Sequence, residues 1–138
     1  MQNCTELVFC RDTVDPDFVT STLGLRPTQS YKVGDVVDIG GIKRPSAVGM
    51  WKLRLDDFQT AESVEEQVVR WLALLNTKSE RMNDLRQLGY LPYLDCRAEK
   101  GSLSLCVDPA ALTGLGALGI ALSVWLYEAP ATESGLNG

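Results

Sequence analysis

The chain has 138 residues, of which 45% are apolar and 22% charged, a composition typical of one soluble globular domain with a substantial core. Its net charge of −5 argues against a nucleic-acid binder, and the lack of histidine removes the commonest general base and metal ligand. No apolar run approaches the roughly 20 residues that cross a bilayer, and residues 1–12 lack the pattern of a signal peptide. We therefore expect a cytoplasmic protein with no membrane contact.

The first elements are a strand and a short helix. Residues 4–11 predict a strand with apolar residues on both faces. Asp15 and Pro16 then have the positions of an N-cap and a first helical residue, and Gly24 is placed to end the helix. A strand over 31–37 follows. Residues 41–49, rich in glycine, proline and small side chains, form the segment that we expect to be most mobile.

The middle of the chain predicts a strand and two helices. Residues 49–57 alternate, with Trp51, Leu53 and Leu55 on one side and Met50, Lys52 and Arg54 on the other. The longest helix begins at Ser63, which has the spacing of a capping box with Glu66. A second helical piece covers 79–89.

The last third predicts a hairpin, a helix and a closing strand. Residues 90–99 pair with a strand over 102–107 across a turn near Gly101. Asp108 and Pro109 repeat the Asp-Pro start of the first helix, and a final strand covers 120–128. Gly114 and Gly116 weaken this helix by roughly 1 kcal/mol each relative to alanine, and we interpret them as allowing close packing against the sheet.

This order of elements predicts an α+β fold, with a mostly antiparallel sheet and helices packed on one face. The arrangement is like a ferredoxin-type unit elaborated by a further half. The two strand–Asp-Pro-helix–strand units are either an internal repeat or a chance agreement of two ordinary helix starts. We expect a single domain over 1–128 and a disordered tail over 129–138.

The chain offers no metal, cofactor or nucleophile motif. Cys4 and Cys10 lie roughly 20 Å apart along one strand, at about 3.3 Å per residue. Cys96 and Cys106 flank the predicted turn and could face each other in one register. We interpret all four as small half-buried apolar residues. The glycine-rich run 114–119 lies inside a helix rather than between strand and helix, so it does not predict a nucleotide site. The tryptophans are interpreted as core residues: Trp51, Trp71 and Trp125.

Two regions of opposite charge follow each other. Residues 26–54 hold six basic residues against two acids, and residues 56–66 hold five acids and no base. The acids are either a solvated surface that favours a helix N-terminus, at about 0.3–1 kcal/mol each, or a patch that steers a basic partner. They are Asp56, Asp57, Glu62, Glu65 and Glu66.

The run DPDFVTSTLGLRPTQSYKVGD, followed by GMWKL, resembles a bacterial domain-of-unknown-function family, the one numbered 4279. The late LGIALSVWLY is similar to its closing strand, so the resemblance covers about residues 4–128. It implies a small stand-alone bacterial protein and, because the family has no assigned activity, no catalytic residue. The matching positions are mainly caps, turns and core: Asp15, Pro16, Thr20, Leu23, Gly24, Pro27, Thr28, Gly34, Asp35 and Trp51.

These observations favour a non-enzymatic binding protein, most concretely an immunity protein that neutralises a toxin encoded nearby. Its contact surface would be the acidic patch of residues 56–66. The alternative is a small-ligand or regulatory domain, with a pocket between the sheet and the loop of Lys43 and Arg44, near Tyr31 and Lys32. An enzyme that acts through Asp, Lys or Tyr is a third hypothesis. The oligomeric state stays open between monomer and homodimer.

Overall fold

The structure is a computed structural model that describes residues 3–55, 63–99 and 106–127. Within these ranges the chain forms a five-stranded sheet, a separate two-stranded sheet and four helices. In chain order they are β1 (Cys4–Arg11), α1 (Pro16–Leu23), β2 (Gln29–Tyr31), β3 (Val36–Ile39), β4 (Ile42–Pro45), β5 (Gly49–Leu53), α2 (Val64–Asn76), α3 (Ser79–Gln87), β6 (Tyr93–Glu99), α4 (Pro109–Ala117) and β7 (Ala121–Tyr127).

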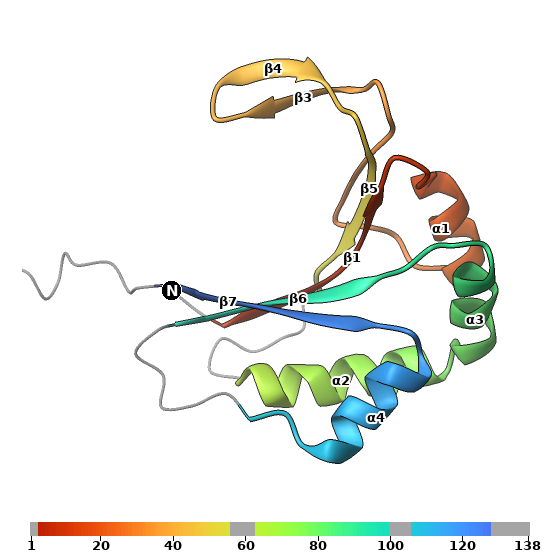
Figure 1. Ribbon diagram of the computed structural model, residues 1–138, viewed down its shortest axis with the longest axis vertical. Coiled ribbons are helices and arrows are strands. Elements are labelled where there is room, and N and C mark those ends of the chain that lie inside the picture. Colours follow the sequence, from red (N-terminus) through yellow and green to blue (C-terminus); the bar gives the residue numbers. More distant parts are fainter. Residues whose placement is uncertain (1–2, 56–62, 100–105, 128–138) are drawn as a thin grey trace, which may run out of the picture.

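The first strand is the central strand of the larger sheet, whose order is β2-β5-β1-β6-β7. β1 pairs antiparallel with both β5 and β6, β2 pairs antiparallel with β5, and only β7 runs parallel to its neighbour, β6. The helices gather on one side of this sheet, and the hairpin of β3 and β4 extends on the other side (Figure 1). The predicted α+β class, with a mostly antiparallel sheet and helices on one face, is confirmed.

The core lies between the helices and the sheet face that they cover. Alternation along β1 turns Leu7 and Phe9 to this side, and β5 adds Trp51, whose ring meets Phe9 edge-on at a centroid distance of 5.6 Å. Trp51 and Trp71 are fully buried, as predicted, but Trp125 is 61% exposed, so its interpretation as a core residue is wrong. The reason is its register: Trp125 lies on the edge strand β7, pairs with Arg97 of β6 and faces away from the helices.

Local capping signals set the helix starts. Asp15 accepts a hydrogen bond at the start of α1, and Gly24 ends that helix with a φ of 68°. Ser63 and Glu66 form the predicted capping box on α2, and Asp108 caps α4. The two Asp-Pro helices therefore share a cap. Cys106 and Val107, expected to end the strand before α4, form no strand, and residues 102–105 of that predicted strand lie outside the described residues.

The segment after α1 differs from the prediction. A strand over 31–37 was expected, but the chain turns at Gly34, whose φ is 92°, and separates β2 from β3. Residues 41–49, predicted to be the most mobile segment, include β4, which pairs with β3 across a turn at Gly40 and Gly41. Both glycines have positive φ, of 61° and 88°, which suits a two-residue hairpin turn.

The predicted pairing of 90–99 with 102–107 is wrong, because β1 and β7 occupy the two edges of β6. Residues 102–105 and the turn at Gly101 lie outside the described residues, as does the predicted tail 129–138. Gly114 does allow close packing, but against a helix: a Cβ there would meet the Leu72 side chain of α2 at 3.1 Å. All four cysteines are free.

Candidate functional site

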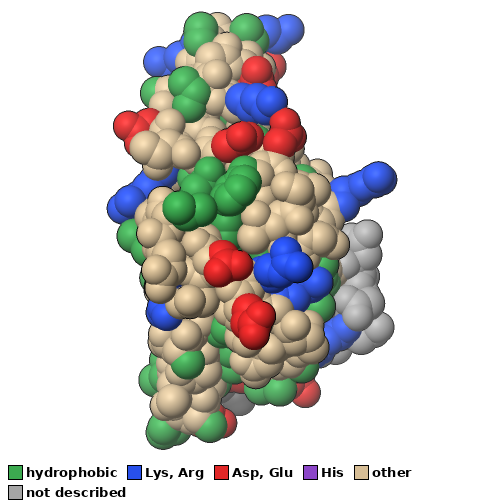
Figure 2. All heavy atoms as spheres, turned by 90° about the vertical axis from the view of Figure 1, so that its right-hand side faces the viewer, with side chains coloured by type: hydrophobic (Ala, Val, Ile, Leu, Met, Phe, Trp, Pro, Cys, Tyr) green, Lys and Arg blue, Asp and Glu red, His purple; other side chains and the backbone are tan. Residues whose placement is uncertain are grey.

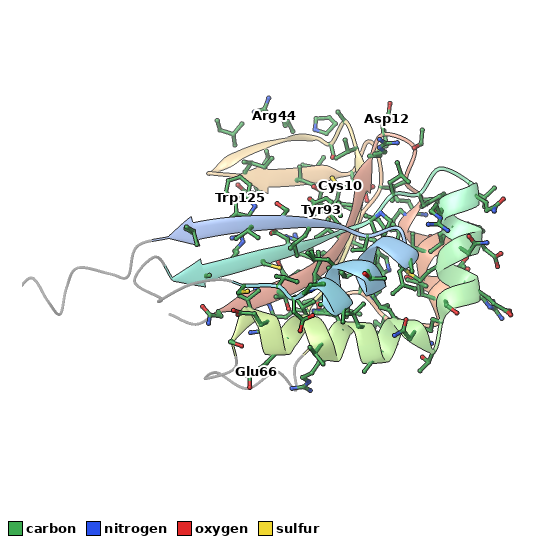
Figure 3. The ribbon with its side chains drawn as sticks, turned by 60° about the horizontal axis from the view of Figure 1, so that its bottom comes forward. Cys10, Asp12, Arg44, Glu66, Tyr93 and Trp125 are labelled. Carbon is green, nitrogen blue, oxygen red and sulfur yellow. The ribbon has the colours of Figure 1, made fainter. Side chains whose placement is uncertain are left out.

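The sheet face opposite the helices is the most distinctive surface of the described chain. We call it the helix-free face. Figure 3 shows Cys10, Tyr93 and Trp125 lying between the sheet and the β3–β4 hairpin, with Arg44 at the outer edge of the hairpin. By strand register, the face is made of Gln29 and Tyr31, Met50, Lys52 and Arg54, Cys4, Glu6, Val8 and Cys10, Tyr93, Asp95 and Arg97, and Ser123 and Trp125.

Two carboxylates lie side by side at the centre of this face. Glu6 of β1 and Asp95 of β6 are directly opposite in the antiparallel register, and each is only 6% exposed. Like charges in this position destabilise a sheet. Cations surround the pair: Arg54 lies 3.2 Å and Lys52 3.8 Å from Glu6. This arrangement makes the centre of the face a buried, mixed-charge cluster.

Asp95 is incompletely satisfied within this cluster. Its Oδ2 lies 3.4 Å from Nε of Arg97, a half-exposed side chain. Its Oδ1 is buried and has no hydrogen-bond partner among the described residues. A buried acceptor without a partner costs about 1–3 kcal/mol. The fold therefore tolerates a buried carboxylate oxygen without a hydrogen bond on Asp95, one of the two paired acids of the helix-free face.

Three side chains of this face, those of Cys4, Cys10 and Tyr93, have raised pKa values. Burial raises the pKa of the Cys4 and Cys10 thiols above the ordinary 9.0. Burial, and then the neighbouring Cys10 and Asp95, also raise the pKa of Tyr93. A nucleophilic thiol needs a lowered pKa, so the Cys4 and Cys10 thiols remain protonated at neutral pH.

Apolar side chains stand exposed on the hairpin above this face. Val36, Ile39 and Ile42 are 68%, 63% and 60% exposed. The root of the hairpin is held by two backbone hydrogen bonds of 2.8 Å, from Gly34 N to Ser46 O and from Ser46 N to Asp35 O. The structure therefore presents an anchored arm whose outer half has no hydrophobic core of its own.

Comparison with known proteins gives a family. The family model described as Domain of unknown function (DUF4279) matches residues 2–129. The chain belongs to this DUF4279 family. The comparisons with curated proteins and with solved structures found no match. The resemblance read from the sequence is thus confirmed.

The residues that suggested DUF4279 have structural roles here. Thr20 Oγ1 accepts a hydrogen bond from Trp51 Nε1 at 3.0 Å and so ties α1 to β5. Thr28 Oγ1 accepts from Arg54 N at 2.9 Å, and Asp35 Oδ2 accepts from Lys32 N at 2.8 Å. In this DUF4279 chain the recognised pattern therefore fixes α1, β2 and the root of the hairpin to the sheet.

The predicted acidic surface is only partly described. Asp56, Asp57 and Glu62 lie outside the described residues. Glu65 accepts a hydrogen bond from Cys106 N at 2.9 Å, and Glu66 accepts one from Ser63 N in the capping box. Both described carboxylates therefore have intramolecular partners. Figure 3 places Glu66 on the side of the molecule opposite the hairpin.

The predicted ligand-binding residues are divided between three places. Tyr31 lies opposite Met50 on the helix-free face, and Lys43 and Arg44 lie on β4. Lys32 turns to α1, where the hydrogen bond to Asp17, at 2.8 Å, raises its pKa. Sequence reasoning missed Glu6, Asp95 and Arg97, because no local pattern shows that β1 and β6 are neighbours.

Other surfaces of the described chain offer fewer signs of a site. The end formed by α1 and α3 carries mixed acidic and basic side chains around a small apolar area (Figure 2). The described residues contain no cluster of three or more His, Cys, Asp or Glu side chains that could hold a metal ion. No helix among them has the length and hydropathy needed to span a membrane.

Proposed function

We propose that the chain is a non-enzymatic protein-binding domain, and that it acts as an immunity protein that neutralises a bacterial toxin. The observation that carries the proposal is the exposure of Val36, Ile39 and Ile42 on an anchored arm that stands over the helix-free face. Exposed apolar groups bordered by polar residues are typical of protein interaction sites. In this proposal the partner packs against the arm and the face together.

The side chains around the arm support a protein partner. Trp125, Tyr93 and Arg97 lie on the helix-free face, and tryptophan, tyrosine and arginine are the residue types enriched at interfaces and among their energetic hot spots. Lys43 and Arg44 add cations to the arm itself. The surface thus combines apolar anchors with charges of both signs.

The overall charge supports a basic partner. A chain with a net charge of −5 attracts basic proteins at long range, which mainly increases the association rate. Residues 56–66 remain our second candidate surface for this contact. The inhibitor would act in the bacterial cytoplasm by covering the active site or substrate cleft of the toxin.

The first test is co-expression of the tagged chain with the product of the neighbouring gene, followed by purification and mass measurement. A stoichiometric complex that suppresses the toxicity of the neighbour is expected. If no complex forms with a toxic neighbour, the inhibitor proposal is wrong.

The surface is then tested with matched variants. Ile39→Ser combined with Ile42→Ser should weaken binding by tenfold or more, because burial of each isoleucine contributes about 1.5–3 kcal/mol and 1.4 kcal/mol is tenfold. Leu88→Ser, at an equally exposed apolar position on the other end of the molecule, is the control and should bind as the wild type does. If only reversal of Asp56, Asp57 and Glu62 to lysine abolishes binding, the partner uses the acidic surface and not the arm.

A small-ligand function is the second candidate, and the unpaired Oδ1 of Asp95 favours it. A ligand with an ammonium or guanidinium group would supply the missing donor. Binding at 100 times the dissociation constant should stabilise the fold by about 2.7 kcal/mol. A thermal-shift screen of small amines, with Asp95→Asn as the control that should lose the shift, tests this function.

A further inference from the structure

The strand β7 ends the sheet with an open and uncharged edge. Among the described residues no strand pairs with β7 on the side away from β6. Its sequence, ALSVWLY, contains no charged residue and no proline, the two devices that commonly block pairing at sheet edges. The edge strand at the other end of the sheet, β2, is only three residues long. The long edge of β7 is therefore suited to pair with a further strand.

The backbone groups that face outward can be identified. Ala121 N donates a hydrogen bond to Pro92 O at 3.2 Å, so the polar groups of Ala121 point towards β6. Successive residues of a strand direct their backbone groups to alternate sides. The N–H and C=O groups of Leu122, Val124 and Leu126 consequently point to the open edge.

The same three residues carry apolar side chains on the helix side of the sheet. Val124 and Leu126 pair with the core residues Cys96 and Ala98 of β6, so they face the layer of helices. Leu122 packs against the core, but Val124 and Leu126 are 40% and 63% exposed, because the helices do not cover the far end of the strand. The edge thus combines open hydrogen-bonding groups with an uncovered apolar row.

We propose that this edge pairs with β7 of a second copy of the chain, antiparallel, about a twofold axis at Val124. In this register Val124 faces Val124 of the second copy. Leu122 of each copy faces Leu126 of the other copy. All three outward residues then form hydrogen-bonded pairs, which gives about six backbone hydrogen bonds at two per pair. The two sheets join into one continuous sheet.

A second copy fits this edge because the strand is self-complementary. Leucines stand two positions on either side of Val124, so the twofold operation places apolar on apolar at every outward position. An isologous contact of this kind is the commonest way in which proteins form dimers. Leu112 on α4, a helix that contacts β7, is itself half exposed. The helix-free face remains open in the dimer.

Sedimentation velocity across micromolar to millimolar concentrations tests the pairing. The wild type should approach twice the 15.1 kDa of one chain as concentration rises. Val124→Lys should stay monomeric at every concentration, because it places two lysines together on the axis, with an unchanged circular dichroism spectrum. Ile42→Lys, an equivalent change on the hairpin, should dimerise as the wild type does. A wild type that remains monomeric, or a Val124→Lys variant that still dimerises, would overturn the proposal.

The register has its own test in a Cys106→Ser background, which removes the exposed native thiol. Residues in a hydrogen-bonded antiparallel pair have Cα atoms about 5.5 Å apart, within the range that a disulfide spans. Val124→Cys should therefore form an intermolecular disulfide on mild oxidation. Ser123→Cys, which would face Trp125 of the second copy, should form much less. Equal cross-linking of the two variants would contradict an axis at Val124.

Discussion

The hydrogen bond between Trp51 and Thr20 allows a quantitative prediction, because it links a fully buried indole to α1. Trp51 is 0% exposed, and its Nε1 donates to Thr20 Oγ1 at 3.0 Å. Thr20→Val keeps the shape of the side chain but removes the acceptor, and so leaves a buried N–H group without a partner. The cost of such a group is about 1–3 kcal/mol. At about 4 °C per kcal/mol for a chain of this length, the melting temperature should fall by several degrees.

Urea denaturation followed by circular dichroism measures this loss, and two further variants assign its cause. Thr20→Ser keeps the hydroxyl and should be closer to the wild type than Thr20→Val. In a Trp51→Phe background, which has no indole N–H, Thr20→Val should cost much less. If Thr20→Val leaves the free energy of unfolding unchanged, or costs the same with and without Trp51, the hydrogen bond does not stabilise the fold as we argue.

Two further predictions concern glycine and cysteine. Gly49→Ala should destabilise the fold strongly in urea denaturation, because its Cβ would collide with the backbone carbonyl of Val14. Gly116→Ala, whose Cβ would meet open space, should leave the free energy of unfolding unchanged or raise it by up to about 1 kcal/mol. Similar losses of stability in both variants would refute the steric argument. Burial raises the pKa of the Cys96 thiol from 9.0, its ordinary value, to about 12. Between these two pH values the thiol loses its proton in the unfolded chain but keeps it in the folded chain. The free energy of unfolding should therefore fall from pH 9 towards 12, by at most about 1.4 kcal/mol per pH unit, and fall less steeply in Cys96→Val; identical slopes in the two proteins would contradict this origin.

The helix starts could be predicted because their signals are local. Asp15 accepts a hydrogen bond from a backbone N–H group of the first turn of α1, and Pro16 has no N–H group that needs a partner. Ser63 and Glu66 satisfy each other's backbone N–H groups, so a few neighbouring residues decide each helix start. The strand β5 was also predicted, because the apolar Trp51 and Leu53 alternate with the charged Lys52 and Arg54 along the chain.

The hairpin was missed for the opposite reason. Val36, Ile39 and Ile42 are exposed, so no buried face imposes an alternation on β3 and β4. The pair Gly40–Gly41 between apolar residues was the available signal, since two adjacent glycines favour a tight hairpin turn. The candidate site could not be found in this way, because Glu6 and Asp95 come together only through the pairing of β1 with β6.

The position of β1 also affects how the chain can fold during synthesis. β1 is made early, yet the strands it pairs with in the sheet are β5 and β6. β6 follows β1 in the chain only after β2, β3, β4 and β5. Until Tyr93–Glu99 has left the ribosome, one edge of this apolar strand has no native partner, and such unpaired edges are prone to aggregate. The native sheet therefore closes only after nearly the whole domain has been translated, so a chain stalled before β6 would depend on chaperones to remain productive.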